Sequence, residues 1–131
     1  MIFLRGYIFS RPFFGERAPQ HVQNIVLRDY CAQRNHTFLM SGTEYAMENC
    51  SLILQQLVDE IDAVDGIVAY SLFQLPTNKN VRDSVIDKIL QKGKAIHFAV
   101  ETLKISDAET RAQCETIWNL KNISTRSPEK I

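Results

Sequence analysis

Cysteines are scarce in this sequence, and those present are poorly placed for cross-linking or metal binding. There are three, Cys31, Cys50 and Cys114, an odd number spread far apart along the chain. Such spacing fits neither a disulfide framework nor the close pairs of ligands that bind zinc. We therefore predict no metal site and no cofactor, and the cytoplasm as the compartment.

An excess of charge of either sign is also missing. Fifteen Lys and Arg balance fifteen Asp and Glu, so the formal net charge is zero. No global positive field concentrates nucleic acid or an anionic membrane surface near such a protein. We predict that neither nucleic acid nor a membrane is a partner.

Long hydrophobic runs are absent as well. Arg5 and Gly6 interrupt the apolar N-terminus MIFLRGYIF, which therefore reads as a first strand rather than a signal peptide. No stretch approaches the roughly 20 apolar residues that span a bilayer. Apolar residues still make up 45% of the 131 residues, enough for one core. We predict a single domain over residues 1–123 and a frayed tail over residues 124–131.

Apolar and β-branched runs alternate with segments of helical period along the chain. That order favours parallel strands joined by crossover helices. The predicted fold is α/β, in three layers, with an approximately four-stranded, mainly parallel sheet and helices on both faces, as in Rossmann-like proteins. The predicted strands are Phe3 to Ser10, Thr37 to Met40, Gly66 to Leu72 and Ala95 to Val100.

Four helical segments separate and follow these strands. The first begins near Pro19, whose fixed φ suits an opening turn. Its predicted inner face holds Val22, Ile25, Val26 and Tyr30, and its polar side begins with Gln23 and Asn24. The others are predicted over 46–63, over 80–91 with a C-terminal glycine at Gly93, and after a capping box formed by Ser106 and Glu109.

Polar residues follow each predicted strand. In an open parallel sheet, ligands bind at the carboxyl ends of the strands. An arginine, two glutamates and three serines meeting at one edge exceed what solvation needs, although loops are polar by default. The polar residues expected at this edge are Ser10, Arg11, Ser41, Glu44, Tyr45, Ser71, Gln74, Asn78 and Glu101.

Three of these residues are candidates for catalysis: Ser10, Glu44 and Glu101. A serine hydroxyl is a poor nucleophile without a nearby base, and no histidine is well placed to supply one. His97 falls within a strand, where we expect a packed ring. Ser10 would therefore orient or attack a substrate, and one of the two glutamates would act as acid or base.

The remaining candidates would bind the ligand. Arg11 and Arg82 suit an anionic group, but Arg82 could equally form an ion pair with Asp83, Asp87 or Glu44. The amides of the first helix could orient hydroxyl groups, or could be ordinary surface residues. The loop PFFGERAP could cover a ligand, or its two Phe could pack against another subunit. The predicted ligand-binding residues are Arg11, Gln20, Gln23, Asn24, Tyr45, Ser71, Gln74 and Arg82.

The order GYIFSR, VQNIVLRDYCAQRNHTF, DGIVAYSLFQLPTN, GKAIHFAVE resembles the catalytic domain of the serine recombinases, the resolvase and invertase class. The resemblance covers about residues 5 to 105, and it implies a resolvase-like fold with Ser10 at the position of the nucleophile and Glu44 near the family's acidic residue. The family's Asp-Arg-Leu-x-Arg motif is replaced here by residues 73–77, FQLPT. Because both arginines are missing, active DNA recombination is not expected.

Several phrases resemble a small bacterial family, the sporadic carbohydrate cluster proteins. They are YIFSRPFFGERAPQHVQN, RDYC, TEYAM, YSLFQLP and HFAVE. The resemblance implies a role in the synthesis of surface polysaccharides or sugar nucleotides, with a sugar or sugar phosphate bound or converted at the carboxyl edge of the sheet. The alternative is a non-catalytic interaction or regulatory module on a recombinase-like fold. A homodimer is expected in either case.

Overall fold

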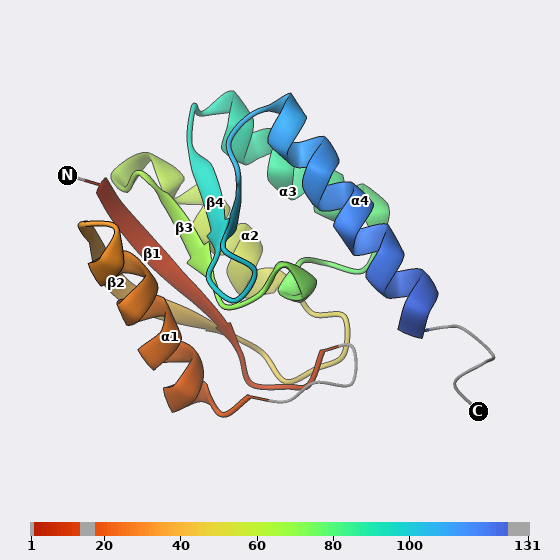
Figure 1. The fold of residues 1–131 in the computed structure, drawn as a ribbon, viewed down its shortest axis with the longest axis horizontal. Coiled ribbons are helices and arrows are strands. Elements are labelled where there is room, and N and C mark those ends of the chain that lie inside the picture. The colour runs from red at the N-terminus through yellow and green to blue at the C-terminus, as the bar shows by residue number, and fades with distance from the viewer. Residues whose placement is uncertain (1, 14–17, 126–131) are drawn as a thin grey trace.

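The computed structural model describes residues 2–13 and 18–125 of the 131 residues. One mixed sheet and its helices make up this part of the chain (Figure 1). The elements are β1 Ile2–Phe9, α1 Gln20–Gln33, β2 His36–Glu44, α2 Leu52–Asp59, the short helix η1 Ile61–Ala63, β3 Gly66–Ala69, the short helix η2 Leu72–Gln74, α3 Lys79–Gln91, β4 Ala95–Phe98, β5 Leu103–Ile105 and α4 Ala108–Thr125.

The sheet has five strands in the order β2-β1-β3-β4-β5. The first four run parallel, and β5 returns antiparallel to β4. The predicted parallel sheet is confirmed, but its predicted four strands are one too few. Strand β4 stops at Phe98 and not at Val100, because the chain turns there with Thr102 at a φ of 55°. Three residues then suffice for β5, which is too short to give a period-two pattern.

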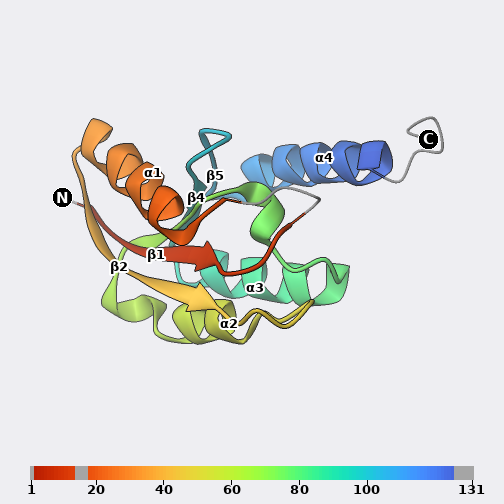
Figure 2. The same cartoon turned by 90° about the horizontal axis from the view of Figure 1, so that it is seen from below.

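Helices cover both faces of the sheet, as predicted. Leu4 and Ile8 face α1, whereas Tyr7, Ile67 and Ile96 belong to the larger core formed with α2, α3 and α4. Figure 2 shows the sheet from its side, with α1 on one face and α2 and α3 on the other. The two cores follow from the alternation of side chains along each strand.

Strand β2 is longer than predicted, nine residues rather than four. Its pairing with β1 skips Met40, since Arg5 lies opposite Leu39 and Gly6 opposite Ser41. The guanidinium Nε of Arg5 donates to the Met40 carbonyl at this bulge. Beyond the bulge the strand continues to its last residue, Glu44, which lies opposite Phe9 and is fully buried.

Helix α2 begins six residues later than predicted, at Leu52. Asn49 has a φ of 61°, in the left-handed region, so the preceding segment cannot be part of the helix. Residues 45–51 instead form a loop. This loop becomes one wall of the recess that lies at the carboxyl edge of the sheet.

The inner face of α1 also differs from the prediction. Its buried residues are Gln23, Leu27, Tyr30 and Cys31, whereas Ile25 is 60% exposed. Relative to the prediction, the helix is rotated about its axis so that the polar residue Gln23, and not Ile25, faces the sheet in the first turns. The reason is that the Gln23 side chain hydrogen-bonds to the backbone of β1, which outweighs the burial of one more aliphatic group.

The C-terminal part of the chain follows the prediction more closely. Gly93 has a φ of 69° after α3, as expected of a C-terminal glycine. The predicted capping box is shifted by one residue, because Asp107 and Thr110, not Ser106 and Glu109, exchange hydrogen bonds at the start of α4. Helix α4 extends to Thr125, and residues 126–131 of the predicted tail lie outside the described part. None of the helices in residues 2–13 and 18–125 is long and apolar enough to cross a membrane.

Candidate functional site

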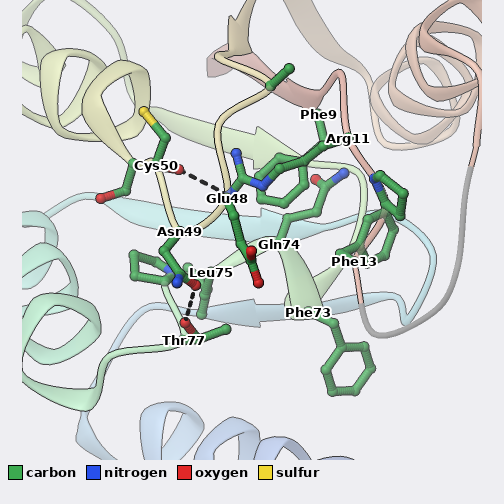
Figure 3. Close-up of a pocket in the computed structure, with 14 residues that line it drawn as sticks. Phe9, Arg11, Phe13, Glu48, Asn49, Cys50, Phe73, Gln74, Leu75 and Thr77 are labelled. Carbon is green, nitrogen blue, oxygen red and sulfur yellow. Dashed lines mark hydrogen bonds between the residues drawn. The ribbon is translucent and has the colours of Figure 1, made fainter.

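A recess of about 410 Å³ opens at the carboxyl edge of the sheet. Its walls come from the end of β1, from the loop before α2, and from η2 with the loop after it. Figure 3 shows Phe13 and Phe73 on one side, Asn49 and Thr77 on the other, and Glu48 between them. The lining residues are Phe9, Arg11, Pro12, Phe13, Ala46, Glu48, Asn49, Cys50, Ser51, Phe73, Gln74, Leu75, Pro76 and Thr77.

Ser10 lies at the end of β1, outside this recess. Its side chain is exposed, and its Oγ donates to the backbone carbonyl of Glu44 at 2.8 Å. Together with Gln20, which is also exposed, Ser10 lines a smaller neighbouring depression of about 230 Å³. No hydrogen bond within the described ranges joins Ser10 to a histidine, a carboxylate or a cation, so nothing there activates its hydroxyl.

Glu44 is buried and accepts hydrogen bonds at both carboxylate oxygens. Oε1 accepts from the Tyr7 hydroxyl at 2.8 Å and from the Leu54 backbone N–H at 3.2 Å. Oε2 accepts from the backbone N–H groups of Tyr45 and Ile53 and from the Cys50 thiol. A carboxylate at a helix N-terminus satisfies N–H groups that lack partners within the helix. These contacts favour a structural role for Glu44, anchoring the start of α2.

Tyr7 contributes to the same contact from the middle of β1. Burial and the adjacent Glu44 carboxylate raise the pKa of its hydroxyl far above the usual value. Tyr7 therefore stays protonated and acts as a hydrogen-bond donor at any physiological pH.

Arg11 lines the recess and holds the loop before α2 in place. Its two terminal nitrogens donate to the carbonyls of Tyr45 and Cys50, at 2.8 and 2.9 Å. Its guanidinium also lies over the Phe9 ring, 4.1 Å from the centroid. A guanidinium carries five N–H donors, and these bonds use two of them. Arg11 thus fixes the wall and still presents charge to the recess.

Gln23 continues the hydrogen bonding of the sheet past the end of β3. Strand β3 pairs with β1 only as far as Tyr7 and Ala69. Beyond that point the Gln23 amide accepts from the Phe9 N–H at 3.0 Å and donates to the Phe9 carbonyl at 2.9 Å. Its Nε2 also donates to the Ala18 carbonyl. The side chain thereby takes the place of a missing strand residue.

Gln74 is tied to Gln23 and leaves one atom without a partner. Its Nε2 donates to Gln23 Oε1 at 2.9 Å. Its own Oε1 is the buried side-chain oxygen or nitrogen that lacks a hydrogen-bond partner in the described part of the chain. The Gln74 side chain is only 1% exposed and lines the recess. An unpaired buried acceptor costs free energy, so it calls for an explanation.

Glu101 and Ser71 also make contacts within the protein. The Ser71 hydroxyl donates to one oxygen of Glu101 at 2.7 Å, and the Leu72 backbone N–H donates to the other at 2.8 Å. The Ser71 Oγ in turn accepts from the Phe73 N–H and caps η2. These bonds position the wall of the recess that η2 provides, and neither Glu101 nor Ser71 lines the recess itself.

Arg82 lies on α3, away from the recess, and is buried. Its guanidinium forms a bidentate pair with Glu115 of α4, with N–O distances of 3.3 and 2.9 Å. It also donates to the carbonyls of Pro76 and Thr77 and lies over the Trp118 ring. The ion-pair alternative therefore describes Arg82, with a partner that the sequence did not indicate because it lies 33 positions away.

Two further predicted ligand-binding residues lie apart from the recess. Asn24 accepts a hydrogen bond from the Ser41 hydroxyl at 2.6 Å, which joins α1 to β2. The Tyr45 side chain is exposed; its backbone carbonyl accepts from Arg11, and its backbone N–H donates to Glu44. Of the eleven residues predicted for the site, Arg11 and Gln74 line the recess.

Sequence reasoning missed the apolar part of the site. The missed residues include Phe9, Phe13, Phe73 and Leu75, which are all buried and line the recess. For Phe13 the signal in the sequence was the loop with consecutive Phe residues, which was considered only as a lid or a subunit contact. Phe13 packs edge-to-face on Phe9 and Tyr70, while Phe14 lies outside the described residues.

His97 lies on the other face of the sheet, and the prediction of a packed ring is confirmed. It is 6% exposed, and its Nδ1 lies 2.7 Å from the Tyr30 hydroxyl. Burial, with the nearby charges of Lys104, His36 and Arg34, lowers its pKa to about 4. Nowhere in residues 2–13 and 18–125 do three or more His, Cys, Asp or Glu gather closely enough to hold a metal ion.

Solved structures with a similar fold include the catalytic domain of an integrase and a site-specific recombinase of the resolvase family. The N-terminal catalytic domain of TP901-1 integrase has a TM-score of 0.66 and 16% sequence identity, covering 92% of this chain and 95% of that one. A resolvase family site-specific recombinase from Streptococcus pneumoniae has a TM-score of 0.63 and 11% identity, covering 94% and 91%. At these identities the likeness shows the fold. The sequence matches no protein-family model and has no significant match among curated proteins.

These findings confirm the predicted resolvase-like fold and correct the predicted function. A role in surface-carbohydrate biosynthesis is wrong, because the similar structures are recombinase catalytic domains and no comparison indicates carbohydrate chemistry. Membership of the sporadic carbohydrate cluster family is not shown. The phrases behind that interpretation include residues 7–13, YIFSRPF, and residues 70–76, YSLFQLP, which contribute several of the residues that line the recess.

Proposed function

We propose that this chain is a recognition domain, which uses a recombinase-like fold to bind a small ligand in the recess at the carboxyl edge of its sheet. The observation that carries the proposal is the recess itself. It combines buried aromatic walls with one arginine and one buried amide oxygen that lacks a partner among the described residues. Ligand sites have this composition, mostly apolar with a few placed polar groups.

The role of the neighbouring polar residues supports binding over catalysis. The carboxylate oxygens of Glu44 and Glu101 accept hydrogen bonds from backbone N–H groups and hydroxyls within the fold. A general acid or base must reach the proton that it transfers. Neither glutamate lines the recess, so a bound ligand meets walls that these residues support.

Competition between a bulky side chain and small ligands tests this proposal. Ala46 is exposed and lines the recess, so Ala46→Trp would fill it without disturbing the core. Ala112→Trp on the exposed side of α4 is the matched control. A chemically diverse fragment set is screened by saturation-transfer NMR against the wild type and both variants. We expect fragments that bind the wild type and Ala112→Trp but not Ala46→Trp. The absence of any such fragment would remove the proposal.

DNA strand transfer through Ser10 is a second candidate, favoured by the likeness to recombinase catalytic domains and by the exposed position of Ser10 at the end of β1. The Ser10 hydroxyl donates to the Glu44 carbonyl. The guanidinium of the next residue, Arg11, donates to the backbone carbonyls of Tyr45 and Cys50. Denaturing electrophoresis after incubation with supercoiled DNA separates the candidates. A protein–DNA adduct that Ser10→Ala abolishes would establish that the Ser10 hydroxyl attacks DNA, the first step of strand transfer, and recognition alone predicts no adduct.

A further inference from the structure

The orientation of the Gln74 amide is fixed by the backbone of β1. The Phe9 N–H is a donor, so the Gln23 atom that it meets must be the oxygen Oε1. The same oxygen lies 2.9 Å from Gln74, so the Gln74 atom facing it must be the nitrogen. A side-chain amide has one oxygen and one nitrogen at its end. The Gln74 oxygen is therefore the atom left without a partner, and turning either amide over would oppose two donors or two acceptors.

This oxygen lies against the aromatic part of the recess. The Gln74 side chain hydrogen-bonds to the Gln23 side chain, which in turn hydrogen-bonds to the Phe9 backbone. The Arg11 guanidinium lies over the Phe9 ring. Figure 3 shows the Gln74 amide beside Phe9, with Arg11 extending across the ring. Around one ring, the recess thus has a buried acceptor that requires an N–H or O–H group and a cation that favours an acceptor. Because the Gln74 oxygen is itself buried, a donor in the recess reaches it only when the side chains over it move aside.

We infer that the recess binds a planar ligand bearing an unsubstituted carboxamide or lactam group, whose N–H donates to Gln74 Oε1 while its flat body packs among Phe9, Phe13 and Phe73. A neutral amide offers a donor beside an acceptor, which matches Gln74 beside Arg11. A planar body suits walls made of aromatic side chains, which pack well against flat rings. This inference rests on the proposed recognition role and specifies the chemistry of its ligand.

A cationic ligand fits less well. An ammonium group would also donate to Gln74 Oε1, and Glu48, which is exposed and lies between the walls of the recess, would attract it. However, the same group would lie close to the Arg11 guanidinium, and like charges repel strongly in a recess with apolar walls. A carboxylate would suit Arg11 but would place an acceptor against the Gln74 oxygen. The neutral amide satisfies both residues.

Four probes of nearly equal size test the inference on the full chain. Benzamide has the N–H donors, acetophenone replaces its NH₂ by CH₃, benzylamine is a cation and benzoate an anion. Dissociation constants are measured by NMR titration. We expect benzamide to bind at least tenfold more tightly than acetophenone, benzylamine or benzoate, because only benzamide satisfies the buried oxygen without a charge conflict.

The variant Gln74→Leu removes the acceptor and retains the apolar wall. We expect it to bind benzamide and acetophenone equally. In the wild type, the side-chain NH₂ resonances of Gln74 should shift with benzamide and not with acetophenone, a readout that needs no variant. Equal affinities in the wild type would show that the ligand makes no hydrogen bond to the Gln74 oxygen, and tightest binding of benzylamine would show a cation site. Either result overturns the amide inference, whereas the recognition role fails only if no fragment binds in the recess.

Discussion

At the scale of single residues, the polar groups at the carboxyl edge hold loops in place around a recess. Their types were visible in the sequence, but their partners were not. Gln23 shows why. A glutamine amide can donate and accept hydrogen bonds equally well on a surface and next to a strand end. Gln23 bonds to the backbone of β1 because β3 stops two residues short of the end of β1 and leaves the Phe9 backbone without a strand partner.

Replacing each member of the amide pair by Leu should have very different effects. Gln23→Leu leaves the Phe9 N–H and carbonyl buried without partners, so we expect the free energy of unfolding to fall by about 3 kcal/mol. Gln74→Leu removes an unpaired oxygen together with one hydrogen bond, so the change should stay within about 1 kcal/mol. Urea unfolding measures both. Equal losses would refute the assignment of the two amides.

The stability of the protein should depend on pH through His97. Its pKa is about 4 in the fold, below the ordinary 6.5, so the unfolded chain binds this proton more tightly. His97 therefore leaves the free energy of unfolding undiminished above pH 6.5. As the pH falls from 6.5 toward 4, protonation of His97 in the unfolded chain lowers this free energy by about 3 kcal/mol in total. The charged or titratable groups around the ring are Tyr30, Arg34, His36 and Lys104.

Denaturant unfolding at several pH values checks this dependence. The variant His97→Gln should remove most of the decrease between pH 6.5 and 4. The matched control is His21→Gln, on the exposed side of α1, which should retain it. A wild type whose stability is flat over this interval, or a control variant that abolishes the slope, would contradict the role given to His97.

At the scale of elements, the start of α2 was the helix boundary that departed most from the prediction, whereas α1 and α3 begin within one residue of the predicted positions. The apolar stripe in the sequence predicted that a helix is present here. Its first turn, however, is fixed by the Glu44 carboxylate at the end of β2, which accepts from the Ile53 and Leu54 N–H groups. We expect Glu44→Gln to destabilise the protein by about 3 kcal/mol, because an NH₂ group would then face the N–H donors of Ile53 and Leu54 or the Tyr7 hydroxyl.

The control for Glu44→Gln is Glu48→Gln, an exposed glutamate in the following loop, which should change the stability by less than about 0.5 kcal/mol. Thermal unfolding followed by circular dichroism compares the two variants with the wild type. If Glu44→Gln is as stable as the wild type, its buried contacts do not anchor α2, and a catalytic role for this glutamate becomes the better explanation.

The start of α4 offers a second test at this scale. Thr110 N–H donates to Asp107 Oδ1 at 2.8 Å, whereas the Ser106 side chain makes none of the capping bonds. Asp107→Ala should therefore lower the melting temperature by a few degrees, and Ser106→Ala should leave it unchanged. The reverse order would restore the capping box expected from the sequence. The prediction was one residue off because the motifs Ser-x-x-Glu and Asp-x-x-Thr share three positions, residues 107–109.

At the scale of the whole molecule, the alternation of strands and helices was sufficient for the parallel sheet, its two covered faces and the edge at which loops gather. Three features could not be predicted. Strand β5 has only three residues, the bulge at Met40 depends on the pairing of two strands, and the Arg82–Glu115 pair joins distant helices. Each depends on contacts that no local pattern encodes.

The recess depends on this larger arrangement too. Its aromatic walls come from β1, the loop that follows β1, and η2, which are more than 50 residues apart in sequence at the extremes. The polar residues predicted the edge of the sheet at which the recess lies, but several of them, including Glu44, Glu101 and Arg82, make hydrogen bonds within the fold instead of lining the recess. Of the predicted polar residues, Arg11 and Gln74 line the recess, together with aromatic side chains and with polar residues of the loops, among them Glu48, Asn49 and Thr77.

Chemical-shift mapping of the ¹⁵N-labelled full chain during titration with the tightest fragment of the screen tests the recognition role most directly. We expect the perturbed backbone amides to cluster at the recess, in the loop before α2 and around η2, at residues Asn49, Cys50, Phe73, Gln74 and Thr77. Shifts that are scattered over the molecule, or confined to the β2 edge, would contradict it.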